Sequence, residues 1–403
     1  MSVPLDRLYH YLDDIVNHDL VIYRWAPHGS RKLEDLRPLI PYTDYQFLNN
    51  PVVICHDQEP LFFERYTQQE FKILTKNLFT KKNDLHLNQE NILDYCSSLN
   101  LRSVAIPNNQ FDGTILLHSE LQSIELEKYQ QANFVPVYFW SHGIIARDWF
   151  RYAEQDPKLK FNVDLMQQDF LIYNRAWGGT REYRLFFAEL LLKCNLIKCT
   201  NTSFNMLEND IDYRQHQFVN KNLRISDFNL HKYFKPNISD SSFSADYTSE
   251  DYSRTGIEIV LETLFDDTRW HLTEKSLRPI ACGKPFMLAA TPGSLQYLRY
   301  YGFETFSGLI DESYDLIAEP HLRLQAIVKE MQRISQLNST KKYKLYTDLD
   351  VVCQRNKQHF FNGFVGQVVD EYKTNLDQAI LIMQQNCTNK HLIEVRRLLE
   401  KNN

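Results

Sequence analysis

Short apolar runs rich in strand-forming residues alternate with longer amphipathic stretches along most of this chain. The alternation constrains the fold, because it is typical of βα units whose helices cover both faces of a parallel sheet. One series of expected strands comprises Leu20–Trp25, Val52–His56, Thr114–Leu117 and Val135–Trp140. A second series comprises Phe170–Asn174, Leu196–Lys198, Ile257–Leu261 and Pro285–Ala289. Helical patterns between the strands include Gln69–Leu78, Ile124–Gln131, Arg181–Lys193 and Ser276–Cys282. We therefore predict an α/β fold with two Rossmann-like, doubly wound domains.

The length of the chain indicates more than one domain, since 403 residues exceed the size at which a single hydrophobic core usually keeps growing. The second strand series begins after Phe161–Gln168, so we place the main boundary there. This gives a first domain over residues 1–165, a second over residues 166–345, and C-terminal helices over residues 346–403 that pack back on the domains. Over Asn205–Ser253 the pattern becomes polar and irregular, which predicts a long insertion.

Composition and charge argue against several classes of protein. A net charge of −6 argues against a nucleic-acid-binding surface along the whole chain, although it leaves room for a local one. No apolar stretch approaches the roughly 18 to 20 residues that span a bilayer, and the first residues lack a secretory signal. The seven cysteines are scattered without a C-x-x-C pair, which suits reduced thiols. We therefore expect a soluble, cytoplasmic protein without a membrane partner.

The most informative segment, His271–Gly293, reads HLTEKSLRPIACGKPFMLAATPG. Thr273 can cap the start of a helix, and Gly283 stands where that helix would end in a left-handed turn. Pro279 would remove one backbone hydrogen bond, so the helix either begins nearer Ser276 or is kinked. The segment thus predicts a short helix that leads into a strand.

The first turn of this predicted helix suits a nucleotide diphosphate. Glu274 can accept hydrogen bonds from ribose hydroxyls, while Lys275, Arg278 and the backbone N–H groups can meet phosphate oxygens. The spacing is equally compatible with an exposed i,i+4 pair between Glu274 and Arg278. The residue types and their spacing leave both alternatives open.

A second candidate segment, Tyr173–Arg184, reads YNRAWGGTREYR and follows an expected strand. Its Gly-Gly turn and helix start form a candidate phosphate cradle, in which Arg175 or Arg181 would supply bidentate contacts. The motif is not a P-loop, because the G-x-x-x-x-G-K-[ST] pattern is missing. An ordinary βα turn with surface arginines is the alternative.

Two carboxylates follow the strand Val52–His56, in the sequence VICHDQEPL. A carboxylate at the carboxyl end of a cleft strand could take the proton from an acceptor hydroxyl, so Asp57 and Glu59 are both candidates for a catalytic base. Residues at a strand end also commonly cap the next helix. The sequence does not choose between the two carboxylates.

Histidines follow two further strands of the predicted first domain. In FWSHGIIARDWFRY, His142 could orient an acceptor, contact a phosphate or share the role of base. It could equally be a structural residue beside Trp140 and Trp149. In RWAPHGSRK, His28 and Ser30 could form an acceptor or phosphate loop.

The segment TEKSLRPIACGKPF resembles the donor-binding signature of fucosyltransferase-like GT-B glycosyltransferases, and it is most similar to related glycosyltransferases of tailed bacteriophages. The continuation PGSLQYLRYYGFETF, the acidic IDESYD, an N-R-x-x-x-x-x-R element and the DQEP element also recur in such proteins. The resemblance implies a GT-B fold, in which two Rossmann-like domains face a central cleft. It also implies that the second domain binds a nucleotide-sugar donor. The implied donor residues are Asn174, Arg175, Arg181, Thr273, Glu274, Lys275, Arg278 and Lys284.

The phage relatives imply a DNA acceptor. In them the resemblance points to transfer of arabinose or glucose, from a UDP-linked donor, onto 5-hydroxymethylcytosine in phage DNA within the infected host. Such a base must be flipped out of the duplex, which favours aromatic walls and a basic rim. The acceptor residues would be His28, Ser30, Trp140, Arg147 and Arg151. A fucosyltransferase-like enzyme acting on a surface glycan is one alternative, and a non-catalytic nucleotide- or DNA-binding protein with a GT-B shell is another.

We expect neither a cofactor nor a metal. A metal-dependent GT-A enzyme would carry a D-x-D pair after a strand, but Asp210–Asp212 lies in the irregular insertion and Asp348–Asp350 lies in a predicted helix. The prediction is therefore direct displacement, with cationic side chains and helix termini stabilising the departing diphosphate.

Overall fold

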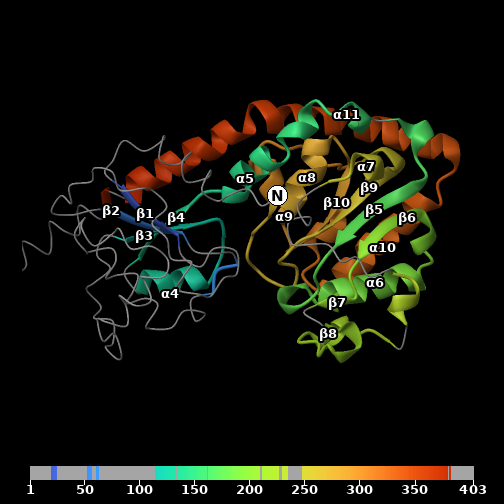
Figure 1. Cartoon of the computed structure of the whole chain (residues 1–403), viewed down its shortest axis with the longest axis horizontal. Helices are drawn as coiled ribbons and strands as arrows, with labels where there is room; N and C mark the ends of the chain where they lie inside the picture. Colours follow the sequence, from blue (N-terminus) through green and yellow to red (C-terminus); the bar gives the residue numbers. More distant parts are fainter. Residues whose placement is uncertain are drawn as a thin grey trace, which may run out of the picture. The chain divides into compact units, whose positions relative to one another are not determined.

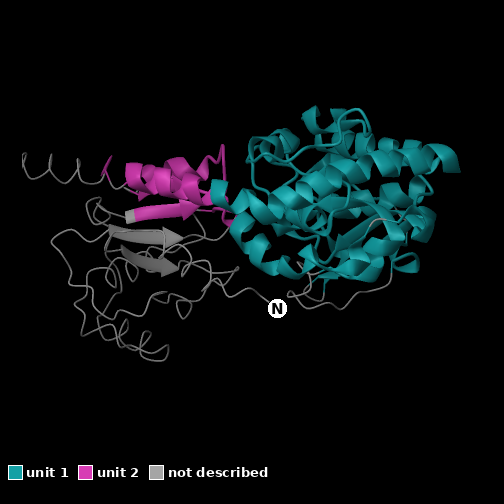
Figure 2. Ribbon diagram, turned by 90° about the horizontal axis from the view of Figure 1, so that it is seen from above, with its two compact units in different colours: residues 1–3, 142–367 teal, residues 4–141, 368–403 magenta. Residues whose placement is uncertain are grey.

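The computed structural model divides the chain into two compact units. Unit 1 comprises residues 1–3 and 142–367, and unit 2 comprises residues 4–141 and 368–403 (Figure 2). The structure describes residues 20–24, 52–56, 60–62, 114–131, 134–160, 162–208, 211–226, 229–234, 247–379 and 381–382. The unit boundary at residue 142 differs from the predicted domain boundary near residue 165, because helix α5 (Ser141–Trp149) and the turns after it cluster with unit 1.

Unit 2 contains a four-stranded parallel sheet in the order β1-β2-β3-β4. The strands are β1 (Leu20–Arg24), β2 (Val52–His56), β3 (Thr114–His118) and β4 (Phe134–Tyr138). Helix α4 (Glu125–Gln131) connects β3 to β4 and packs beside β4. These bounds confirm the first predicted strand series to within a few residues. The predicted helix Gln69–Leu78 lies outside the described residues. A C-terminal helical segment packs on β4, since the Asn375 side chain donates to the carbonyl oxygen of Tyr138 at 2.8 Å.

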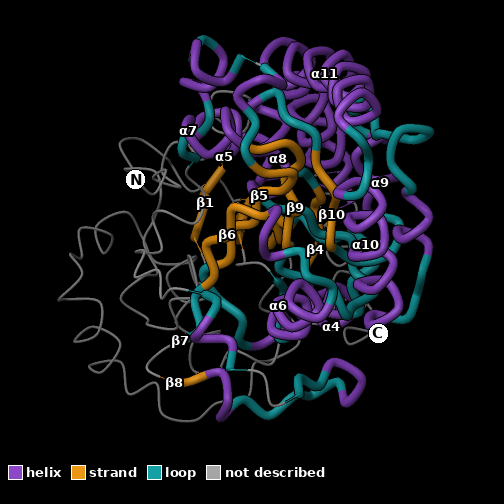
Figure 3. The backbone as a smooth tube through the Cα atoms, turned by 90° about the vertical axis from the view of Figure 1, so that its right-hand side faces the viewer, coloured by secondary structure: helices purple, strands orange, loops and turns teal. Residues whose placement is uncertain are grey.

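Unit 1 contains a second parallel sheet, in the order β10-β9-β5-β6. Its strands are β5 (Gln168–Asn174), β6 (Thr200–Phe204), β9 (Thr255–Leu261) and β10 (Phe286–Ala289). Helices α7 (Ser249–Arg254), α8 (Glu274–Cys282) and α11 (Ser339–Asn362) lie over one face, and α6 (Tyr183–Lys193) and α10 (Pro320–Ser335) lie over the other (Figures 1 and 3). Helix α9 (Ser294–Tyr300) follows β10. Both faces are therefore covered, as βα alternation predicts.

The core of unit 1 explains why the apolar runs form the central strand β9 and the edge strand β10. All seven residues of β9 and all four of β10 are buried, which matches strands covered on both faces. The expected strand Leu196–Lys198 is wrong. Asn195 adopts a left-handed conformation with φ of 55°, the chain makes a 3₁₀ turn over Ile197–Cys199, and the strand is instead β6. This edge strand reads TNTSF and its three central residues are only partly buried, so it lacks the apolar signal of a central strand.

The insertion and the C-terminal region follow the predicted pattern. Described parts of Asn205–Ser253 contain short 3₁₀ turns and a two-stranded hairpin of β7 (Leu207–Glu208) and β8 (Ile211–Asp212). Helix α11 runs across the predicted start of the C-terminal helices at residue 346, and helical structure continues in the described residues up to 379, so the prediction of helices there is confirmed. Among the described residues, no helix combines the length and apolar character needed to cross a membrane.

Candidate functional site at the carboxyl edge of the unit 1 sheet

The carboxyl ends of β5 and β9 are joined by one buried arginine. The guanidinium of Arg184 donates to the Asn174 side-chain oxygen at 2.9 Å and to the carbonyl oxygens of Ala176, Leu261 and Glu262 at 2.7, 2.6 and 2.8 Å. Ligands of open α/β sheets bind at this edge. The Asn174 oxygen, predicted to bind the donor, is therefore engaged in holding two strand ends together.

Helix α8 begins at this edge, as its sequence predicts. Thr273 caps the helix, and its hydroxyl accepts a hydrogen bond from the Lys275 backbone N–H at 3.3 Å. Gly283 ends the helix with φ of 67°, which confirms the left-handed turn. The helix starts at Glu274 with Pro279 inside it, so the alternative of a later start near Ser276 is wrong.

A buried carboxylate that the sequence analysis missed fixes the first turn of α8. Glu262, which directly follows β9, accepts from the backbone N–H and hydroxyl of Thr273 at 3.0 and 2.8 Å and from the Ser276 hydroxyl at 2.6 Å. Burial would raise the pKa of Glu262, but Lys275 and these hydrogen bonds outweigh it, so the pKa is lowered and the group stays ionised. The sequence signal that could have identified Glu262 is its position as the first polar residue after the buried strand β9.

A lysine and a histidine contact Glu274 at the start of α8. Glu274 is 7% exposed, and its carboxylate lies 2.8 Å from Lys275 Nζ and 3.3 Å from His142 Nδ1. The His142 and His271 rings make an edge contact with centroids 5.2 Å apart. Burial would raise the pKa of Glu274, but Lys275 and His142 hold it well below its usual range. This arrangement provides an ionised acceptor and a cationic donor side by side.

The glycine turn after β5 binds a carboxylate of the chain itself. Oε2 of Glu208, on β7, accepts from the backbone N–H groups of Trp177 and Gly178, both at 2.5 Å. Its Oε1 lies 3.5 Å from the guanidinium of Arg181. Arg175 has no acceptor among the described residues, and its Nε is buried. The turn thus has the anion-binding character that its sequence predicts.

Two predicted donor residues lie away from this edge. Arg278 is buried, its guanidinium lies 2.5 Å from Glu258 in the middle of β9, and it donates to the Tyr252 hydroxyl at 3.1 Å. An exposed pair between Glu274 and Arg278 is also wrong, because both side chains are buried with other partners. Lys284 is buried at the amino end of β10, and burial lowers its pKa. One turn of helix carries Arg278 from the sheet edge to its face.

The structure describes three of the predicted acceptor residues: Trp140, Arg147 and Arg151. Trp140 is fully buried, so its ring offers no exposed wall for a base. Arg147 lies over the Phe361 ring at 4.6 Å and donates to its carbonyl oxygen at 3.3 Å. Arg151 donates to the Asp148 carbonyl oxygen at 2.5 Å. The remaining predicted residues, Asp57, Glu59, His28 and Ser30, lie outside the described residues.

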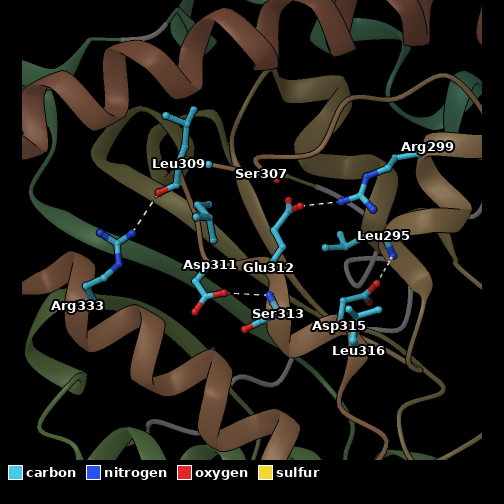
Figure 4. Close-up of a pocket in the computed structure, with 12 residues that line it drawn as sticks. Leu295, Arg299, Ser307, Leu309, Asp311, Glu312, Ser313, Asp315, Leu316 and Arg333 are labelled. Atoms are coloured by element: carbon cyan, nitrogen blue, oxygen red, sulfur yellow. Dashed lines mark hydrogen bonds and ion pairs between the residues drawn. The ribbon is translucent and has the colours of Figure 1, made fainter.

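A pocket of about 590 Å³ lies between α9, α10 and the turn that precedes α10. Its arginines have partners: Arg299 donates to Glu312 at 2.7 Å, and Arg333 donates to the Leu309 carbonyl oxygen at 3.1 Å (Figure 4). Asp315 also lines the pocket, and burial raises its pKa to about 6. Because its cations are matched by acceptors of the chain, we do not assign a ligand to this pocket.

Asp315 should make the protein less stable as the pH rises from about 4 to 6. Burial raises its pKa in the folded state from 3.8 to about 6, so between pH 3.8 and about pH 6 the folded chain holds a proton that the unfolded chain has lost. The contribution reaches about 2 to 3 kcal/mol at about 1.4 kcal/mol per pKa unit. Asp315→Asn keeps an acceptor for the Leu295 N–H and removes the titration. Urea unfolding across this range should show the variant gaining stability over the parent as the pH rises; parallel curves would contradict the assignment.

Among the described residues, no group of three or more His, Cys, Asp or Glu side chains could hold a metal ion. Comparison of the whole chain with protein-family models, with curated proteins and with solved structures found no match.

Proposed function

We propose that this protein is a nucleotide-sugar-dependent glycosyltransferase of GT-B architecture, with the donor held by unit 1. One observation carries the proposal: the first turn of α8 presents an ionised carboxylate, Glu274, and a cation, Lys275, at the carboxyl edge of a parallel sheet. Ribose hydroxyls need acceptors and diphosphates need cations, so this pair suits both parts of a nucleoside diphosphate.

We assign each side chain around Glu274 and Lys275 a role in binding the donor. Glu274 accepts from ribose hydroxyls, and the Lys275 ammonium group meets the diphosphate. Arg175 supplies a guanidinium that is not already committed to an acceptor within the described residues. His142, beside Glu274, orients that carboxylate and stabilises charge on the departing diphosphate. Glu262 acts through Thr273 and Ser276, so it is a positioning residue.

The proposed reaction is direct displacement at the anomeric carbon. The acceptor hydroxyl loses its proton to Asp57 or Glu59, its oxygen bonds to the anomeric carbon, and the bond to the donor phosphate breaks. Lys275 and Arg175 stabilise the nucleoside diphosphate that leaves. The proposed acceptor is 5-hydroxymethylcytosine in DNA, with arabinose or glucose from a UDP-linked donor; this part is supported by the sequence resemblance.

A donor and acceptor panel tests the function directly. The full chain is incubated with UDP- and GDP-linked sugars and hydroxymethylated DNA, and the nucleosides are analysed by mass spectrometry. A hexose or pentose adduct that disappears in Asp57→Asn or Glu59→Gln supports the proposal. Nucleotide binding without turnover on DNA or glycan acceptors would favour a non-catalytic binding protein.

Lys275→Met is expected to weaken binding of the donor nucleotide about ten- to hundredfold, since hydrogen bonds to charged groups contribute about 1.5 to 3 kcal/mol. Calorimetric titration with UDP and GDP measures the effect. Lys344→Met is the matched control, because it removes the same charge from a side chain on α11 that is 79% exposed. Equal nucleotide affinity in both variants, with thermal midpoints unchanged, would remove Lys275 from the donor site.

A further inference from the structure

The glycine turn of the proposed donor site already contains an anion. Glu208 accepts two backbone hydrogen bonds, from Trp177 and Gly178, with the same oxygen. Successive N–H groups that converge on one oxygen are the arrangement by which backbone turns bind phosphate. The carboxylate therefore stands where a phosphate oxygen of a donor would be recognised.

The turn is built for close approach of an anion. A Cβ added at Gly178 would lie 3.2 Å from a Glu208 oxygen, so the glycine leaves room for it. Gly179 has a φ of 63°, a backbone conformation that residues with a side chain rarely adopt. The two glycines thus have different roles: one gives access to the N–H groups, and the other gives the turn its shape.

More positive charge gathers here than one carboxylate neutralises. Burial and the nearby guanidinium groups of Arg184 and Arg175 lower the pKa of Arg181 to about 10. Arg184 is committed to carbonyl oxygens and Asn174, whereas Arg175 has no acceptor among the described residues. Within the described part of the chain, the buried Trp177 Nε1 also has no hydrogen-bond acceptor. These donors suit a ligand with more than two oxygens.

Glu208 comes from the insertion, which is held over the turn by reciprocal contacts. The β7–β8 hairpin lies beside α6 (Figures 1 and 3). In the other direction, Glu182 at the start of α6 accepts from the backbone N–H groups of Val219 and Asn220, both at 2.8 Å. Met206 and Tyr213, on either side of the hairpin, are also buried, so the contact made by Glu208 is one of several that hold this part of the insertion, and a competing anion could replace it.

We propose that Glu208 is a removable internal ligand, which occupies the diphosphate site of the glycine turn until the donor displaces it. The inference rests on the proposed function, and it adds a regulatory step to the same site. When a site is available only in a fraction of molecules, the apparent affinity falls by that fraction. Displacement of Glu208 would also couple donor binding to movement of the β7–β8 hairpin.

Inorganic pyrophosphate is the probe for this competition. We expect Glu208→Gln to bind pyrophosphate roughly tenfold more tightly than the parent chain in calorimetric titration, since loss of the charge weakens the internal contact. The amide oxygen can still accept from the turn, so the fold should be retained. Asp212→Asn is the matched control: it removes one negative charge from β8 of the same hairpin, where the carboxylate contacts Arg214 and His231.

Two further measurements separate displacement from a simple change of charge. Pyrophosphate binding to the parent chain should increase hydrogen–deuterium exchange in the peptide that carries Leu207 and Glu208. Arg175→Ala in the Glu208→Gln background should abolish the gain in affinity.

The outcomes distinguish this inference from the donor-site proposal. Equal affinities of the parent and Glu208→Gln, or equal gains in Glu208→Gln and Asp212→Asn, would overturn the internal ligand, while nucleotide binding that depends on Lys275 would leave the donor site standing. Failure of every variant to bind pyrophosphate or nucleotide would overturn both.

Discussion

Replacement of Arg278 by methionine is expected to lower the free energy of unfolding by about 3 to 5 kcal/mol, because it leaves a buried carboxylate without its cation. Arg278 is 3% exposed, and its guanidinium lies 2.5 Å from Glu258, which is 1% exposed. It also lies over the Tyr173 ring at 4.9 Å. Urea unfolding of the full chain, followed by circular dichroism, measures the loss.

The double variant Arg278→Met with Glu258→Gln is the control for this prediction. Removal of both charges should restore much of the stability, since the cost of the single variant comes from the unpaired carboxylate. The same variants also test the role that the sequence assigned to Arg278. Parent-like stability in Arg278→Met, together with weaker nucleotide binding, would return this residue to the donor site.

Glu262→Gln is expected to cost about 2 to 4 kcal/mol of stability and to weaken nucleotide binding about tenfold, because a buried acceptor is replaced by a group with its own donors. The carboxylate of Glu262 accepts from Thr273 and from the Ser276 hydroxyl. An amide in its place puts N–H groups against those donors and shifts the first turn of α8. Chemical unfolding and calorimetric titration with UDP measure the two effects.

Ser276→Ala gives the reference for the Glu262 prediction. It removes one hydrogen bond to the same carboxylate, so about 1 kcal/mol of stability should be lost while the Thr273 contacts remain. If Glu262→Gln costs no more than Ser276→Ala and nucleotide affinity is unchanged, Glu262 does not position the start of α8.

The elements with strong local signals could be predicted from sequence. Strands β5, β9 and β10 are apolar because helices cover both faces of their sheet, so their buried runs stand out. Thr273 and Gly283 mark the ends of α8 because capping depends on the backbone conformation of a few adjacent residues. Strand β6 could not be found this way, since an edge strand with partly exposed residues has no comparable apolar run.

The candidate site was predictable only in its location. The sequence placed polar residues after β5 and before α8, and parallel topology brings those positions to one edge. It could not identify Glu262 and Glu208 as the carboxylates that organise this edge. Glu208 meets Gly178 across 30 residues of chain, and such a pairing leaves no local pattern.

By itself, the sequence determined the α/β architecture, the ends of α8 and the gathering of charged residues near strand ends, because these follow from local periodicity and backbone preferences. The tertiary structure decided which charges are already committed. Burial forces a charge to find a partner, and the partners of Arg184 and Arg278 lie on other elements. Arg175, by contrast, has no acceptor among the described residues, and Lys275 pairs with the adjacent Glu274 at the start of its own helix.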